Sequence, residues 1–135
     1  ISDPGIYAPR QVSSNQLQNN QGSSQRNITA DFWDLQMPGD TFNFNQIPFH
    51  FGVMIYVQCN SPTIWLTKSL IHPPAPASWG EFQIKPIPNE IQVECNKWIY
   101  QGNSIDEPSH YVTGGWAQVF LYEGRAICRQ DYYFE

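Results

Sequence analysis

The sequence has few charged residues and no concentration of positive charge. Asp, Glu, Lys and Arg make up 14% of the 135 residues, against roughly 25% in an average globular domain. The seven Lys and Arg residues are scattered, and the formal net charge is −5. Nucleic acids and anionic membrane surfaces attract clustered basic side chains. We therefore expect no nucleic acid among the partners of this chain.

Long apolar runs and helical patterns are also missing. The longest apolar run covers residues 53–57, whereas a helix that spans a bilayer needs about 20 apolar residues. No window of the sequence carries apolar residues at helical spacing with caps, and eleven prolines interrupt the chain. These absences argue against membrane insertion and against a helical fold.

Motifs for metal, cofactor or catalytic chemistry are equally scarce. The three histidines lie far apart, without HxH or HExxH spacing, and the cysteines form no CxxC pair. Residues 106–110 bring an acid, a hydroxyl and an imidazole close in sequence, but no nucleophile elbow accompanies them. We interpret that stretch as a polar turn. The sequence predicts a protein that is not an enzyme and that has no cofactor and no metal.

Three cysteines are present, an odd number. Cys59, Cys95 and Cys128 each fall on the apolar parity of a predicted strand, as a free cysteine does when it packs as a small hydrophobic residue. One disulfide with a leftover thiol is the alternative. Asn27 begins an Asn-Ile-Thr triplet and is a candidate glycosylation site.

The first 30 residues differ in composition from the rest. Residues 11–27 consist mainly of Gln, Asn, Ser and Gly, and such a segment has too little apolar surface to fold alone. It is either a flexible leader or an arm that orders on a neighbouring subunit. The sequence thus predicts a polar, extended N-terminal arm over residues 1–30 and a folded domain over residues 31–135.

The domain carries the period-2 alternation of β-strands. Apolar and polar residues alternate clearly over 51–59 and 91–96, and Glu123-Gly124 can form a two-residue hairpin turn. The predicted strands are 41–45, 51–59, 64–70, 81–85, 91–96, 116–122 and 125–131, with turn-rich segments at 72–76 and 102–110. About seven short strands with such turns predict an all-β fold, a two-sheet antiparallel β-sandwich of the jelly-roll or immunoglobulin-like type.

Aromatic residues, 15% of the chain, give the strongest functional signal. Tyr56, Trp65 and Trp98 fall on the parity opposite the aliphatic residues of their segments, and Trp79 follows a proline-rich loop. Such rings can wrap the edges of a small core, anchor a protein interface or stack on sugar rings. We take these four residues as candidate ligand-binding residues.

The composition resembles that of virion-surface and other shell proteins: little charge, many Asn, Gln, Pro and aromatic residues, and a polar arm. It favours a non-catalytic structural or attachment domain that self-assembles, such as a capsid, spike or filament subunit. The expected partner is a second copy, held through the arm and the aromatic face, with a glycan or cell-surface receptor as a further possibility. The alternative is a secreted, lectin-like carbohydrate-binding module that uses exposed Trp residues. Both hypotheses place the protein outside the cell or on a virion surface.

Overall fold

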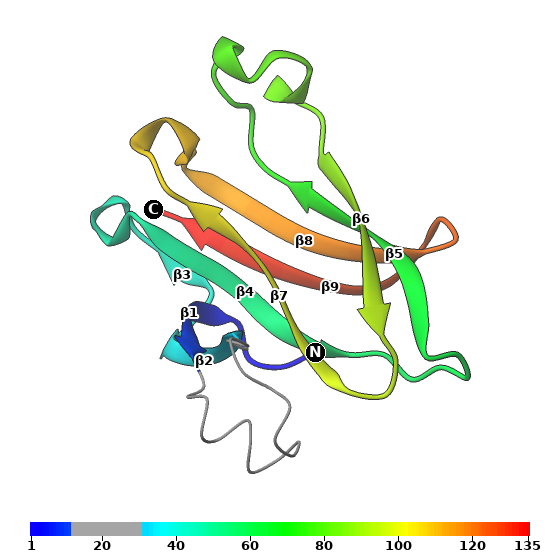
Figure 1. Ribbon diagram of the computed structural model, residues 1–135. Helices are drawn as coiled ribbons and strands as arrows, with labels where there is room; N and C mark the ends of the chain where they lie inside the picture. Colours follow the sequence, from blue (N-terminus) through cyan, green and yellow to red (C-terminus); the bar gives the residue numbers. More distant parts are fainter. Residues whose placement is uncertain (12–30) are drawn as a thin grey trace.

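Nine strands form a two-layered sandwich in the computed structural model, which describes residues 1–11 and 31–135 (Figure 1). The strands are β1 Gly5–Gln11, β2 Asp31–Pro38, β3 Thr41–Phe42, β4 Phe49–Tyr56, β5 Thr63–Ile71, β6 Ile87–Glu94, β7 Trp98–Ile105, β8 Gly114–Tyr122 and β9 Arg125–Phe134. Three short 3-10 helices complete the described part of the chain: η1 Phe44–Gln46, η2 Ala77–Gln83 and η3 Pro108–His110. Within the described ranges, no helix has the length and hydrophobicity needed to traverse a bilayer.

The two sheets have four and five strands. The first sheet has the order β2-β1-β4-β7, and the second has the order β3-β9-β8-β5-β6. All described strand pairs are antiparallel except β3 with β9. The predicted all-β, two-sheet sandwich is confirmed.

The core lies between the sheets and has two parts. Alternation along β4 turns Phe51, Val53 and Ile55 inward, where each is almost completely buried. One cluster is rich in aromatic rings and includes Phe51 and Phe134; the other is largely aliphatic and surrounds Phe120. The sandwich is therefore packed by the inward parity of its strands, as the sequence pattern predicts.

A polar seam separates the two clusters. Lys68 lies between Leu66 and Leu70 on the inward face of β5, and its Nζ donates to the Gly102 carbonyl of β7 at 2.9 Å. Burial lowers the pKa of Lys68 from its usual value. Beside it, the completely buried Gln118 accepts a hydrogen bond from Tyr132 Oη at 3.1 Å. This seam joins the two sheets through polar contacts inside an otherwise apolar core.

A disulfide closes one end of the sandwich. Cys59 and Cys95 are bonded, with their Cα atoms 5.5 Å apart, so our preferred interpretation of three free cysteines was wrong and the alternative of one disulfide is correct. Asn96 adds three hydrogen bonds there: its amide Nδ2 to Cys59 O, Cys59 N to its Oδ1, and its backbone N to Val57 O. Cys128 is free and half-buried, and burial raises its pKa.

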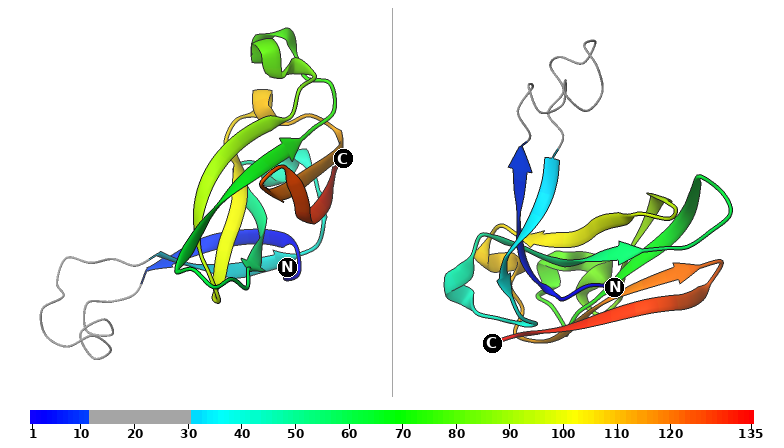
Figure 2. Two further views of the ribbon diagram at one scale, coloured as in Figure 1. Left: turned by 90° about the vertical axis from the view of Figure 1, so that its right-hand side faces the viewer. Right: turned by 90° about the horizontal axis from the view of Figure 1, so that it is seen from below.

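The N-terminal residues contribute a strand of their own. Residues 5–11, which the sequence assigns to the arm, form β1 and pair with both β2 and β4. β1 and β2 run side by side, and their ends at residues 11 and 31 point away from the sandwich (Figure 2). Residues 12–30, including the candidate glycosylation site Asn27, lie outside the described residues. The arm hypothesis therefore stays a prediction for that segment.

Several predicted strand boundaries were wrong. Residues 81–85 are not a strand; most of them belong to η2, where Gly80 has a positive φ of 61° and Ala75 N donates to Gln83 O. Conversely, β1, β2 and β7 were missed, and the predicted turn-rich segment 102–110 begins inside β7. The described residues form nine strands rather than about seven. The predicted hairpin turn is confirmed, with positive φ at Glu123 and Gly124.

Candidate functional site

A cavity of about 590 Å³ opens at the end of the sandwich opposite the disulfide. β6 and β7 are joined by the turn at residues 95–97, belong to different sheets, and diverge from that turn (Figure 1). The cavity lies between the far part of β7, the end of β5, the start of β6 and the helices η2 and η3. Its lining residues are Leu70, Ser78, Trp79, Phe82, Ile87, Asn103, Ser104, Ile105, Ser109, His110 and Trp116.

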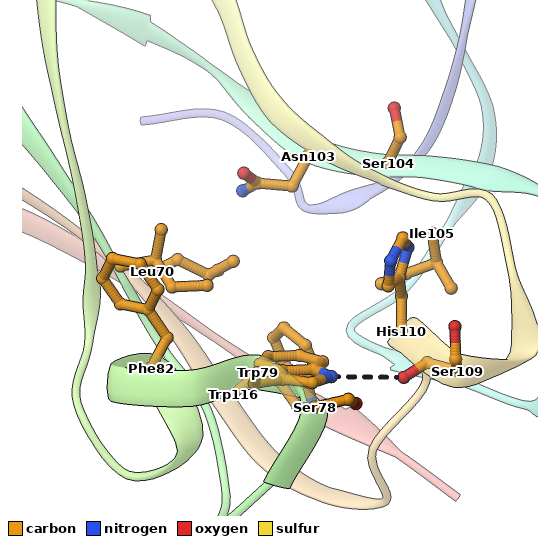
Figure 3. A pocket seen from close by; sticks show the side chains of 11 residues that line it. Leu70, Ser78, Trp79, Phe82, Asn103, Ser104, Ile105, Ser109, His110 and Trp116 are labelled. Atoms are coloured by element: carbon orange, nitrogen blue, oxygen red, sulfur yellow. Dashed lines mark hydrogen bonds between the residues drawn. The ribbon is translucent and has the colours of Figure 1, made fainter. Parts of the chain in front are cut away.

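Aromatic rings form the floor of the cavity. Trp79, Phe82 and Trp116 lie below the open space in Figure 3, with β7 above it. Trp116 is buried, donates from Nε1 to Val112 O at 2.7 Å, and stacks on Phe134 with ring centroids 4.6 Å apart. Because Trp116 belongs to the aromatic core cluster that contains Phe134, the cavity floor continues that cluster.

The segment before η2 positions Trp79. Trp79 N donates to the carbonyl of Pro76, and Trp79 Nε1 donates to Ser109 O on η3 at 3.3 Å (Figure 3). His72 is buried beside it, with ring centroids 4.8 Å apart, and its two ring nitrogens face the carbonyls of Pro73 and Lys85 at 2.7 and 3.1 Å. The histidine thus contacts the segments on both sides of η2, and the Trp79 indole connects η2 to η3.

Asn103 faces the floor from β7. Its side chain projects over the open space in Figure 3, and its Nδ2 is buried without a hydrogen-bond partner among the described residues. Adjacent side chains alternate between the two faces of a strand, so Ser104 points away from the cavity and bonds His50 Nδ1 at 2.5 Å. Asn103 is therefore the polar side chain that β7 presents to the cavity.

The lining provides hydrogen-bonding groups, and none of its eleven described residues is Lys, Arg, Asp or Glu. Ser109 Oγ donates to the Glu107 carboxylate at 3.3 Å rather than to His110, so the 106–110 loop holds no aligned acid, base and hydroxyl. Within residues 1–11 and 31–135, no three His, Cys, Asp or Glu side chains are grouped as metal ligands. The arrangement is suited to binding an uncharged group.

The four predicted ligand-binding aromatics do not share one site. Tyr56 and Trp98 form an exposed pair on the outer face of the first sheet, with ring centroids 5.6 Å apart and side chains 45% and 53% exposed. Trp65, 59% exposed, lies on β5 in the second sheet. Of the four, only Trp79 lines the cavity.

Sequence reasoning missed most of the residues around these sites. Asn103, Phe82 and Trp116 were not singled out, although Trp116 lies on a correctly predicted strand. Tyr100 was missed as well; it stacks on Trp33 at 4.2 Å and extends the aromatic surface of the first sheet away from Trp98. A prediction of β7 would have revealed both Asn103 and Tyr100, because their parities place them on opposite faces of that strand.

The edges of the two sheets differ in how they are protected. Free edges invite pairing with another chain, and charged residues and prolines discourage it. β6 carries Pro88, Glu90 and Glu94, and β2 carries two Asp residues and ends at a proline, while β3 has only two residues. β7 has eight residues, WIYQGNSI, with neither charge nor proline, and pairs with β4 alone among the described strands.

No protein-family model matches the chain, and no curated protein matches its sequence. Its structure is similar to the crystal structure of an immunoglobulin-like protein from Pseudomonas aeruginosa, with a TM-score of 0.53 and 11% sequence identity over 99% of this chain and 98% of that one. The fold is immunoglobulin-like. At this identity the similarity concerns the fold alone, which is compatible with a non-catalytic structural domain.

Proposed function

We propose that this immunoglobulin-like chain is a non-catalytic structural domain that self-assembles, with the free edge of β7 as the acceptor for an extended segment of a second copy. The observation that carries the proposal is the lack of charge and proline along β7, in contrast to β2 and β6. Strand addition satisfies the backbone donors and acceptors of an edge without requiring charge pairing.

The exposed pair of Tyr56 and Trp98 also supports the β7 edge as the interface. Trp98 is the first residue of β7 and lies opposite Tyr56 in the register of β4 and β7. A strand added to β7 would lie beside this pair, and exposed Trp and Tyr rings are the residue types that anchor protein interfaces. Backbone pairing would give the interface its direction, and the two rings would bury apolar area next to it.

The N-terminal segment of a second copy is the donor that we favour. Residues 11–25 contain no charged residue and are rich in Asn, Gln and Ser, so they match the uncharged edge in chemistry. The strands that flank this segment, β1 and β2, have their ends at residues 11 and 31 pointing away from the sandwich (Figure 2). An oxidising compartment outside the cytoplasm suits the Cys59–Cys95 bond, consistent with a filament or virion-surface subunit.

Solution mass tests the edge. We expect the intact chain to form oligomers in sedimentation-velocity runs, and Gln101→Lys, in the middle of β7, to shift the mass to the monomer. Gln101 is half-buried on the inward parity of β7, which it shares with Ile99 and Asn103, and an inward-pointing charge on an edge strand opposes an added strand. The matched control is Gln92→Lys on the already charged edge β6, which should leave the mass unchanged.

The donor is tested separately by replacing residues 12–30 with a short Gly-Ser turn. Gln11 and Asp31 are paired in the β1–β2 ladder, so such a turn can preserve both strands. We expect this variant to be monomeric, unlike the intact chain, and to keep the stability of the folded domain. A mass that responds to neither Gln101→Lys nor the loop replacement would refute assembly through β7.

A further inference from the structure

We propose that the cavity beside β7 is a binding site for a neutral saccharide ring. The site is separate from the outer-face aromatics Tyr56, Trp65 and Trp98, and the proposal does not depend on assembly through β7. It rests on the shape of the cavity, the uncharged lining, and the unsatisfied amide of Asn103.

The size and the floor suit a flat, partly apolar ring. At about 590 Å³, the cavity falls within the range of roughly 300–1,000 Å³ of small-molecule sites. Trp79 and Phe82 present aromatic rings to the open space (Figure 3). The C–H face of a pyranose ring is apolar and packs against aromatic rings, while its hydroxyl groups remain at the periphery.

Asn103 distinguishes a sugar from a hydrocarbon. A buried amide N–H group without a partner has an energetic cost of about 1–3 kcal/mol, and Asn103 Nδ2 is buried and unpaired among the described residues. A ligand with an acceptor oxygen opposite the aromatic floor relieves that cost when the amide, which its neighbours cover in this structure, turns about its Cβ–Cγ bond toward the cavity. A purely apolar ligand would leave it in place, so the amide favours a hydroxylated ring.

The remaining polar groups lie at the rim. Ser78, Ser109 and His110 are exposed and border the cavity, where they can reach the peripheral hydroxyl groups of a bound ring. Lys, Arg, Asp and Glu are not among the described lining residues. Anionic ligands such as phosphates and sialic acids would therefore lack a counter-charge, and the site favours neutral sugars.

The experiment is a saturation-transfer NMR screen of the intact chain. The probes are glucose, galactose, mannose, N-acetylglucosamine and their β-linked disaccharides, with sialic acid and indole as the charged and the hydrocarbon-like comparison. We expect at least one neutral sugar to bind and sialic acid to be rejected. Titration then gives the affinity of the best neutral probe for each variant.

Three substitutions locate the binding. Trp79→Ala removes part of the floor, and Ser78→Trp obstructs the rim without removing a buried side chain; both should abolish the signal. Asn103→Leu keeps the approximate shape but removes the amide, and should weaken sugar binding by about tenfold, of the order expected for a buried hydrogen bond, without weakening indole. Trp65→Ala is the matched Trp control on a distant, exposed face and should leave binding unchanged.

Thermal unfolding of every variant checks that the fold is retained. A screen in which no neutral sugar binds would overturn the proposal. So would sugar binding that survives Ser78→Trp, or that disappears in Trp65→Ala, because either result places the ligand elsewhere. The replacement of residues 12–30 with a Gly-Ser turn separates the two proposals: it should abolish assembly and leave sugar binding intact, so either property can fail without the other.

Discussion

The two ends of the sandwich differ in how the space between the sheets is filled. At one end, the Cys59–Cys95 bond and the hydrogen bonds of Asn96 hold the β4–β5 loop against the β6–β7 turn, above the aliphatic cluster around Phe120. At the other end, β6 and β7 have diverged, and a cavity takes the place of packed side chains (Figure 1). The same pair of strands thus borders a sealed end and an open one.

This difference indicates which end of the domain tolerates substitutions without a large loss of stability. A close-packed cluster responds to the loss of even a few atoms, whereas residues that border open space lose few contacts. The sealed end has the disulfide and buried aliphatic side chains, and the open end has exposed serines and 3-10 helices. We expect stability to depend mainly on the first end and ligand chemistry on the second.

The largest expected effect comes from removing one phenyl ring at each end. Phe120→Ala should lower the free energy of unfolding by roughly 3–5 kcal/mol, because its completely buried ring would leave a cavity. Phe82→Ala, at a half-buried ring that already borders open space, should cost only about 1 kcal/mol. Urea unfolding measures both, and equal losses would show that the two ends are packed alike.

Opening the sealed end chemically should have a slightly smaller effect. The disulfide joins residues 36 positions apart, and loss of such a crosslink costs roughly 3–4 kcal/mol through the entropy of the unfolded chain. We expect the double variant Cys59→Ala/Cys95→Ala to lose about that much in urea unfolding. Cys128→Ala serves as the control at the free thiol; a loss of equal size there would attribute the effect to cysteine packing instead.

The smallest effect concerns the polar seam between the two core clusters. In the folded chain, burial lowers the pKa of Lys68 below its ordinary 10.5. Between the folded and unfolded pKa values, the unfolded chain binds more protons, so stability should rise with pH in that window. Below the folded pKa, Lys68 is charged in both states, and the folded protein bears the full cost of burying that charge. Burial raises the pKa values of Tyr100 and Tyr132 in the folded chain. Above about pH 10 the unfolded chain loses these protons first, so the folded state becomes less stable.

Lys68→Met should remove the rise. We expect the difference in unfolding free energy between the two proteins to change steadily in urea titrations as the pH rises toward 10.5, the ordinary pKa of Lys, because only the wild type releases the buried proton. Subtracting the variant cancels the tyrosine contribution common to both. A pH-independent difference would mean that Lys68 titrates normally in the folded chain.

The sequence predicted the sandwich because most of its strands alternate plainly. Phe51, Val53 and Ile55 repeat with period 2, and the Glu123-Gly124 turn fixes the last hairpin. β7 was missed for a physical reason: its centre is Gln-Gly-Asn-Ser, which local propensity assigns to a turn, and pairing with β4 overrides that preference. The predicted strand at 81–85 was wrong for the opposite reason: alternation over five residues does not supply a neighbouring strand with which to pair.

The candidate sites were predicted only in part. Parity correctly separated Tyr56 and Trp98 from the core, since neighbouring residues of one strand face opposite sides. It could not show that they lie opposite each other on β4 and β7, or that Trp79 meets Asn103 across a cavity, because these are long-range relations. The cysteines were ambiguous for the same reason: bonding requires Cα atoms within about 7 Å, a distance that strand parity does not provide.

The protection of the edges has a consequence for symmetry. If β7 pairs with β7 of a second molecule, both acceptors are used at once, and a two-fold dimer closes with nothing left to extend. If the segment at residues 12–30 is the donor, donor and acceptor differ, and each added molecule presents a fresh acceptor. Such a head-to-tail arrangement yields rings or fibres of many subunits. The stoichiometry of the assembly would therefore identify the donor before any interface is seen.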